Sequence, residues 1–354
     1  STDETSGIAR RAVERARARG VDVRYLHRTA RAGFKAGALE AGLRSARGEL
    51  VAVFDADFVP APDFARAIVD AFTDPAVGMV QARWGHLNRH NSALTHVQAM
   101  FLDGHFVIEH TARNRSGRFF NFNGTAGIWR RACIEDAGGW QHDTLTEDLD
   151  LSYRAQMRGW QFVYLPDHVA PAELPEEMSS FKSQQHRWAK GSIQTARKLL
   201  PAILRSDLPR HVKLEATFHL TANAGYVLML ALAFQVGPAI WLRRDIAPWL
   251  LAGVDLPLFT LSSVSVAAFY VAAHREALGR ARRSLRWMPF LMAVGIGLSL
   301  NNARAVLEAL RGHVSEFRRT PKYALDRGAS LSGRSYRGRV NRDTWIELGI
   351  AVYF

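Results

Sequence analysis

Two long apolar runs in the second half of the chain constrain its fold more than any other feature. The run Thr217–Leu242 is longer than the roughly 20 residues that a helix needs to cross a bilayer. The run Trp249–Ala273 is also long enough, and it carries one acid, Asp255, near its start. Trp241 and Trp249 flank the short connection, as tryptophans at a membrane–water interface do. Because two such runs in tandem are rare in soluble cores, we predict two transmembrane helices rather than a buried helical hairpin.

A third apolar run, Met288–Leu300, is too short to span a bilayer and becomes polar at Asn301 and Asn302. We therefore predict that Trp287–Arg311 forms an amphipathic helix on the membrane surface. The arginine-rich segment HREALGRARRSLR follows the second run and is expected on the cytoplasmic side. The first half of the chain would then lie on that side as well.

These patterns divide the chain into consecutive parts. The predicted parts are a cytoplasmic domain over residues 1–177, interfacial amphipathic helices over 178–212, two transmembrane helices over 213–275, a cytoplasmic interface helix and loop over 276–344, and the start of a further transmembrane helix over 345–354. The final segment, WIELGIAVYF, looks like a membrane helix that stops after its first turns. We therefore expect this chain to be a piece of a longer protein.

Charge and cysteine content narrow the choice of partners. A net charge of +13 suits nucleic acid, an anionic membrane face or anionic substrates. The basic excess is spread over membrane-proximal segments, and the sequence contains no recognised nucleic-acid-binding motif. Both observations favour a lipid bilayer as partner over nucleic acid. The single cysteine, Cys133, excludes an internal disulfide and a cysteine-based metal site.

The first half of the chain alternates helix-like and strand-like runs. Strands are predicted over residues 21–28, 49–57 and 77–84, and helices over 7–19, 33–46 and 61–74. This alternation predicts an α/β domain with a mostly parallel sheet. Ligands of such sheets bind beyond the carboxyl ends of the strands, and the sequence FDAD occupies one of these ends.

The FDAD sequence carries two acids that an extended chain points to the same face, Asp55 and Asp57. Two close carboxylates repel each other unless a positive group joins them. Mg²⁺ or Mn²⁺ with a bound diphosphate meets this need, because hard cations prefer oxygen ligands. The alternative is a polar strand end that turns into a loop at Pro60.

The sequence TLTEDLDLSYRAQMRGW predicts a helix that Thr146 caps and that ends before Gly159. Three acids lie in its first turn: Glu147, Asp148 and Asp150. They either suit the positive end of the helix dipole, or one of them is a general base that takes a proton from a sugar hydroxyl.

Two glycine-containing stretches are further candidates. Lys35 lies among small residues that allow close backbone approach, where a lysine meets a phosphate or a base carbonyl. An ordinary helix start explains the same pattern. Gly124 and Gly127, with Asn123 and Thr125, predict a tight loop that leads into a helix or strand.

The segment QQHRWAKGS precedes the apolar runs. If it is helical, Gln184, Arg187 and Trp188 are spaced i, i+3 and i+4 and share one face. An amphipathic helix at a membrane surface uses the same residue types. The segment alone does not decide between a binding face and a membrane-surface face.

The order of these motifs carries more information than each motif alone. D-x-D, an F-x-G-T loop, T-E-D and Q-Q-H-R-W, followed by apolar spans, resembles the processive, membrane-embedded family 2 glycosyltransferases: cellulose synthase, its cellulose-synthase-like relatives and the glucomannan mannosyltransferases. KAGAL matches the donor-binding K-A-G motif of that family. STDET resembles the tail of its D-D-S-x-D segment. FRRTPK at Phe317–Lys322 resembles its F-x-V-T-x-K gating loop, with Arg319 in place of the valine and Pro321 at the variable position. The resemblance covers nearly the whole chain.

The resemblance implies a nucleotide-sugar-binding domain of the GT-A type in a multi-pass protein of the inner or plasma membrane, with the catalytic domain cytoplasmic. Asp55 and Asp57 would hold the nucleotide diphosphate together with Mg²⁺ or Mn²⁺. Lys35 and Gln184 would contact the donor. Arg187 would stabilise the leaving diphosphate as the glycosidic bond breaks.

The same resemblance assigns the acceptor side, which would hold a growing polysaccharide. Asp148 would be the base that deprotonates the acceptor hydroxyl, giving inversion from an α-linked donor to a β-linked product. Trp188 would lie beneath the terminal sugar, and Asn123, Gly124 and Thr125 would lie near the acceptor terminus. The two spans would help to form a channel for the polymer.

Several alternatives stay open at this level. A non-processive relative would transfer one sugar to a lipid-linked acceptor, a transporter would carry an inactive domain of this fold, and a basic membrane protein would bind nucleic acid. UDP-glucose and GDP-mannose both fit as donors, although GWQFVYLPDHVAPAELP resembles the mannan and mixed cellulose-like branch more closely than cellulose synthase proper. Phe58 stands where cellulose synthase carries a histidine after D-x-D, so the metal coordination is expected to differ. The sequence identifies no export or assembly partner.

Overall fold

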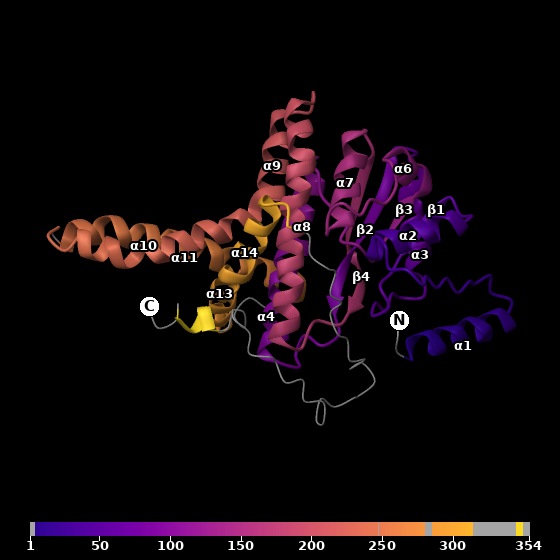
Figure 1. Cartoon of the computed structure of the whole chain (residues 1–354), viewed down its shortest axis with the longest axis horizontal. Helices are drawn as coiled ribbons and strands as arrows, with labels where there is room; N and C mark the ends of the chain where they lie inside the picture. The colour runs from indigo at the N-terminus through magenta and orange to yellow at the C-terminus, as the bar shows by residue number, and fades with distance from the viewer. Residues whose placement is uncertain (1–3, 247, 280–284, 314–344, 350–354) are drawn as a thin grey trace.

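The computed structural model describes residues 4–246, 248–279, 285–313 and 345–349. Figure 1 shows an α/β domain built on one sheet, a long helix beside it, and further helices that project away from the domain. The N-terminal half of the chain forms the domain, and the two most apolar helices form the projection.

A four-stranded sheet forms the centre of the domain. Its strands are β1 (Leu50–Val53), β2 (Val77–His86), β3 (Gly127–Arg130) and β4 (Gln161–Ala172). The spatial order is β1-β3-β2-β4, with β3 antiparallel to both of its neighbours and β2 parallel to β4. The predicted α/β class is confirmed, but the sheet is mixed rather than mostly parallel, because β3 runs against the other three strands.

The strand predicted over residues 21–28 is wrong, whereas those over 49–57 and 77–84 correspond to β1 and β2. Residues 21–28 are irregular, and the apolar side chains of Val21 and Leu26 are 54% and 56% exposed. Apolar residues stabilise a strand only where another layer covers one face of it. No such layer covers this segment, so nothing offsets the entropy of ordering it.

Helices cover both faces of the sheet, because adjacent strand residues point to opposite sides. The helices on one face are α2 (Phe34–Ser45), α6 (Arg131–Asp136) and α7 (Glu147–Met157); those on the other are α3 (Phe64–Val69) and the 3₁₀ turn η1 (Asp70–Thr73). Met79 and Trp129 pack on the α2, α6 and α7 side, and their neighbours Val80 and Ile128 pack against α3 and η1. α1 (Thr5–Ala18) buries no residue.

A continuous helical segment connects the sheet to the apolar helices. It consists of α4 (Ala93–Asp103), a π-helical stretch η2 (Gly104–His110) and α5 (Thr111–Arg115). Ser92 begins α4 with a capping box, in which its hydroxyl accepts from the Thr95 N–H at 3.1 Å. Gly104 lies against α11, since a Cβ there would be 2.7 Å from the Phe269 ring. A glycine is therefore needed for this close approach.

The long helix α8 (Met178–Arg205) contains the QQHRW motif and stands between the domain and the remaining helices, as Figure 1 shows. It packs against α7, against α9 (Arg210–Thr221) and against α14 (Ser299–Leu310). Gly191 lies so close to the start of α7 that a Cβ would be 2.5 Å from Cγ2 of Thr146. Arg187 precedes Gly191 by one turn, so the same face of α8 directs it toward α7.

Three helices are long and apolar enough to cross a membrane by length and composition: Arg210–Leu242, Pro248–Leu278 and Met288–Leu310. The first contains α9, η3 (Ala222–Ala224) and α10 (Gly225–Leu242), the second is α11 (Pro248–Leu278), and the third contains α13 (Met288–Gly297) and α14. The first two include the predicted transmembrane runs. The third also reaches the required length, so the position of this helix on the membrane surface stays a prediction.

Some predicted features lie outside the described residues. These are the N-terminal residues 1–3, the loop over Phe317–Lys322 and the last residues 350–354. Residues 345–349 are helical, and Glu347 forms an ion pair with Lys182 of α8.

Candidate active site

Four segments that are distant in sequence meet where β1 ends. They are the start of α2 with Lys35, the FDAD segment with Asp55, the loop before β3 with Gly124, and the start of α7 with Asp148. Lys35 joins the first three, because its Nζ donates to Oδ1 of Asp55 at 2.7 Å and to the carbonyl of Gly124 at 2.9 Å. The structure therefore brings together residues that the sequence separates by up to 113 positions, from Lys35 to Asp148.

The backbone around Lys35 explains the small residues beside it. Gly33 caps α2 with a φ of 68°, in the left-handed region that favours glycine. A Cβ at Gly37 would be 2.4 Å from the carbonyl oxygen of Ala32, so the chain also needs a glycine there. The turn that these residues form directs Lys35 toward Asp55.

The loop before β3 fits closely between Asp55 and Asp148. The backbone N–H of Asp55 donates to Oγ1 of the buried Thr125 at 2.9 Å. Gly124 has a φ of 81°, and a Cβ there would be 2.9 Å from Oδ2 of Asp148. A side chain at position 124 would therefore displace the Asp148 carboxylate.

Two carboxylates begin α7, the buried Glu147 and the half-buried Asp148, and desolvation is the largest influence on the pKa of both. Burial raises the pKa of Asp148, and the charge of Lys35 opposes the rise. Burial and the neighbouring Asp148 charge raise the pKa of Glu147 to about 7, again against Lys35. The backbone N–H of Leu149 donates a hydrogen bond to Oδ1 of Asp148 at 2.8 Å and so orients the carboxylate. The sequence motif named Glu147 together with Asp148 and Asp150, but it did not predict that Glu147 is part of the site.

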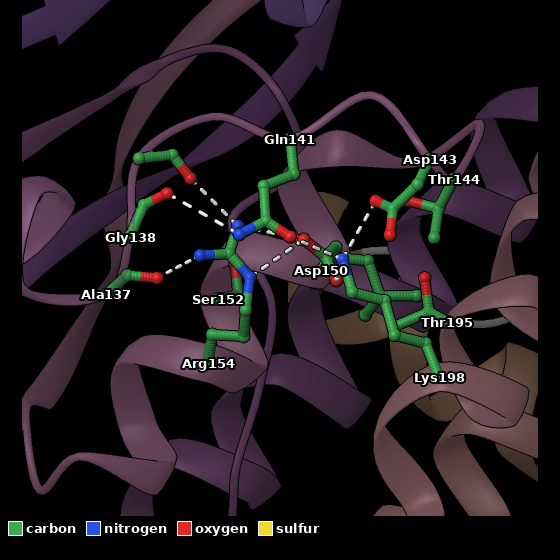
Figure 2. Close-up of polar contacts among 12 residues, drawn as sticks. Ala137, Gly138, Gln141, Asp143, Thr144, Asp150, Ser152, Arg154, Thr195 and Lys198 are labelled. Atoms are coloured by element: carbon green, nitrogen blue, oxygen red, sulfur yellow. Dashed lines mark hydrogen bonds and ion pairs between the residues drawn. The ribbon is translucent and has the colours of Figure 1, made fainter.

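Asp150, the third acid of the motif, has a structural role. It is fully buried, and Figure 2 shows Arg154 and Lys198 both reaching its carboxylate, at 2.8 and 2.9 Å. Lys198 also donates to Oδ1 of Asp143 at 2.8 Å, and Arg154 donates to the carbonyl of Gly139 at 2.8 Å. Asp150 thus connects α7 to α8 and to the 137–143 loop. Loss of one partner from such a buried pair costs about 3–5 kcal/mol.

Thr146 occupies the predicted N-cap position of α7, but its side chain makes no capping hydrogen bond. Its hydroxyl lies 3.3 Å from that of Thr195 on α8 instead. The Leu145 N–H donates to Oε1 of Gln194, also on α8, at 2.9 Å. The prediction that the Thr146 side chain caps the helix is wrong, because the close approach of α8 at Gly191 supplies other partners.

The QQHRW motif is helical, and its three candidate residues are half-buried on α8. Burial lowers the pKa of Arg187, and the charges of Glu147, Asp148 and Asp55 act against the decrease. Arg187 therefore lies within electrostatic range of the whole acidic group. Gln184 and Trp188 lie one turn before Arg187 and next to it, respectively, on the same helix.

A buried lysine near the middle of α8 pairs this helix with one of the apolar helices. Lys190 is fully buried and donates to Oε2 of Glu308 on α14 at 3.0 Å. His186 lies 3.4 Å from the same oxygen. No sequence pattern predicts this contact, because Lys190 and Glu308 are separated by 118 positions.

The residues at the predicted metal position suit a cation that the substrate helps to bind. Among the described residues, no group of three or more His, Cys, Asp and Glu side chains is arranged to hold a metal. Asp55 and Asp57 supply carboxylate oxygens at the end of β1. Mg²⁺ is commonly held by one or two carboxylates with substrate phosphates completing the shell. The two aspartates therefore fit a divalent cation that enters with a diphosphate.

The comparison with protein families agrees with this geometry. Residues 1–191 match the model of the glycosyltransferase-like family 2, and the chain belongs to that family. It is 45% identical over 199 residues to glucomannan 4-beta-mannosyltransferase 2 of Arabidopsis thaliana, covering 55% of this chain and 37% of that protein. It is 34% identical over 354 residues to the probable glucomannan 4-beta-mannosyltransferase 9 of Oryza sativa subsp. japonica, covering 95% of this chain and 64% of that protein.

The chain spans between 37% and 64% of the length of these plant relatives. Among solved structures, it is similar to the mannosyltransferase PcManGT from Pyrobaculum calidifontis in complex with GDP-Man and Mn²⁺. That likeness has a TM-score of 0.50 and 21% sequence identity, and it covers 88% of this chain and 75% of the other. The two proteins share a glycosyltransferase fold, which confirms the predicted fold class.

We expect the buried Glu147 to make stability depend on pH. The pKa of Glu147 is about 7 in the folded protein, raised from the ordinary value of 4.5. Proton binding to Glu147 therefore adds to the free energy of unfolding below pH 4.5, and this stabilisation is lost as the pH rises to about 7. The free energy of unfolding of Glu147→Gln should therefore rise by up to about 3 kcal/mol relative to that of the wild type between pH 5 and pH 8. The measurement is the apparent unfolding temperature in metal-free buffer across that range.

Glu135→Gln, which removes an exposed carboxylate on α6, is the matched control for this comparison. A difference between Glu147→Gln and the wild type that stays constant from pH 5 to pH 8 would contradict the assignment of a buried, proton-binding Glu147.

Proposed function

We propose that the protein is a membrane-bound, inverting hexosyltransferase that extends a β-linked polysaccharide with mannose from GDP-mannose. The observation that carries the proposal is the group of Asp55, Glu147 and Asp148, in which Lys35 pairs with Asp55 and the charges of all three act on Lys35 and Arg187. Cationic side chains beside a group of carboxylates suit a substrate with a diphosphate and an acceptor that loses a proton. The choice of mannose rests on the names of the plant relatives, which are 4-beta-mannosyltransferases.

On the donor side, Asp55 and Asp57 would hold a divalent cation, Mg²⁺ or Mn²⁺, together with the nucleotide diphosphate. When bound, the cation would neutralise charge on that diphosphate. Lys35 is paired with Asp55 and would contact the phosphates, and Gln184, one turn from Arg187 on α8, would contact the donor as well. Arg187 would stabilise the negative charge that grows on the leaving diphosphate.

On the acceptor side, Asp148 would take the proton of the attacking hydroxyl. Its burial raises its pKa, which makes the carboxylate a stronger base than an exposed aspartate. The acceptor oxygen then forms a bond to the anomeric carbon as the bond to the diphosphate breaks. Attack from the opposite side inverts that carbon, so an α-linked donor gives a β-linked product.

Trp188 would offer a flat apolar surface to the terminal sugar of the acceptor. Asn123, Gly124 and Thr125 form the loop beside Asp148 and would lie near the acceptor terminus. The apolar helices would pass the polymer across the inner or plasma membrane, with the catalytic domain on the cytoplasmic side. The arginine-rich segment after the second span supports this orientation.

The rival functions explain the site less well. A transporter with an inactive domain has no need for the buried Glu147 carboxyl beside Asp148, which is costly to maintain without a ligand. A non-processive enzyme for a lipid-linked acceptor would use the same donor site. Product length separates that rival from the proposal.

The first test offers radiolabelled GDP-mannose and UDP-glucose separately to membranes that contain the full-length protein, with Mn²⁺ or Mg²⁺. We expect label from GDP-mannose in ethanol-insoluble polymer. Polymer from UDP-glucose alone would contradict the assignment of mannose. Label confined to organic-soluble lipid would contradict the processive reaction.

A second test concerns the base. Asp148→Asn should lower the transfer rate at least about 100-fold, because the amide cannot accept the proton, and it should leave GDP-mannose binding largely intact. Transfer and binding are measured on the same membranes. Asp63→Asn, an exposed aspartate before α3, is the matched control. Wild-type turnover in Asp148→Asn would overturn its role as the base.

A further inference from the structure

The π-helical stretch η2 brings two histidines to one side chain of the acceptor loop. Residues five apart are separated by about 140° around an α-helix. A π-helix has the wider turn of an i→i+5 hydrogen bond, which brings residues five apart closer to the same side. His105 and His110 are five apart in η2, and their ring centres are 4.3 Å apart. The π-turn is therefore the reason why both imidazoles reach Asn123.

The hydrogen bonds around Asn123 have one consistent direction. His110 Nε2 lies 3.1 Å from the carbonyl of Asn121 and 2.8 Å from Oδ1 of Asn123. Because a carbonyl only accepts, His110 Nε2 carries a proton and donates to both oxygens. The amide of Asn123 is thereby oriented, and its Nδ2 donates to Nε2 of His105 at 3.0 Å.

The remaining contacts fix the tautomer of His105. Its Nδ1 lies 3.1 Å from Oε2 of Glu109 and donates to it. Burial would raise the pKa of Glu109, but His105 and Arg113 outweigh it and lower that pKa to about 2, so Glu109 is an ionised acceptor. Arg113 also contacts this carboxylate at 3.2 Å. A continuous chain of hydrogen bonds thus runs from His110 through Asn123 and His105 to Glu109.

The position of this chain connects it to the chemistry. Asn123 precedes Gly124, whose carbonyl binds Lys35 and whose Cα lies against the Asp148 carboxylate. The second Nδ2 hydrogen of Asn123 has no protein acceptor among the described residues, and Asn123 is half-buried rather than enclosed. A sugar hydroxyl is a suitable acceptor for that hydrogen.

We propose that His105 is a positioning residue of the acceptor site, which acts with Glu109 to orient the Asn123 amide toward a hydroxyl of the acceptor sugar. The proposal rests on the proposed function, because it concerns the acceptor of that same reaction. His105 would act on acceptor binding, and the donor contacts of Lys35 and Asp55 would be unaffected.

Two substitutions of His105 separate this role from general support of the fold. A glutamine places its terminal group near the position of Nε2, so His105→Gln keeps an oxygen that accepts from Asn123. An asparagine reaches only the position of Nδ1, so His105→Asn loses the contact with Asn123. Both variants are polar and similar in size, and a merely structural role of the histidine would not distinguish them.

The experiment uses the full-length protein in membranes, with GDP-mannose as donor and a β-1,4-linked mannooligosaccharide as acceptor. We expect His105→Asn to raise the acceptor KM about tenfold, which corresponds to the loss of one hydrogen bond, and to leave the donor KM within about twofold. The share of GDP-mannose hydrolysed to free mannose should rise. His105→Gln should stay close to the wild type, as should the control His90→Asn, which changes an exposed histidine.

Equal acceptor KM values for the asparagine and glutamine variants would overturn the proposal, and so would a parallel loss of donor affinity. If His105→Asn does not accumulate, Glu109→Leu carries the same test, because it removes the acceptor that fixes the His105 tautomer, and an unchanged acceptor KM there would overturn the proposal. A wild-type protein that transfers from no nucleotide sugar would instead overturn the proposed function and the inference with it.

Discussion

The candidate site is held together by the ammonium group of Lys35. It joins the end of β1 to the loop before β3, through Asp55 at 2.7 Å and the carbonyl of Gly124 at 2.9 Å. Three carboxylates lie near it, and buried like charges cannot stay together without a compensating cation. Burial alone would lower the pKa of Lys35, but the charges of Asp55, Glu147 and Asp148 outweigh burial and raise it. Lys35 therefore stays charged and allows the acidic group to exist before any substrate arrives.

Helix α8 connects this chemistry to the membrane part of the chain. Gly191 lets its backbone lie against Thr146 at the start of α7, and Arg187, one turn earlier, faces the carboxylates. The same helix pairs the buried Lys190 with Glu308 on α14, at the opposite side from the sheet. A change in the packing of the apolar helices would thus reach Arg187 through one rigid element. In a polymerising enzyme this arrangement would couple the reaction centre to the exit of the product.

The sequence predicted the parts of the site that local chemistry determines. The strand before Asp55, the glycines beside Lys35, the helix that starts with Glu147 and the helical spacing of Arg187 all follow from short-range rules. It did not predict what depends on contacts between distant segments. The strand expected over residues 21–28 lacks a covering layer, Asp150 is a buried structural link, and the π-turn that brings His105 to Asn123 has no simple sequence pattern. Short-range rules cannot show these features, because each is decided by a neighbour far away in the chain.

We propose that the carboxylates at the end of β1 receive a metal-bound diphosphate. The most direct test is calorimetric titration of GDP-mannose into the full-length protein, with and without Mn²⁺, for the wild type and for Asp57→Asn. The account predicts that tight binding requires Mn²⁺ and that Asp57→Asn weakens it by at least about tenfold, because one of two carboxylate ligands is lost. Equal affinity with and without the metal in the wild type would contradict the account.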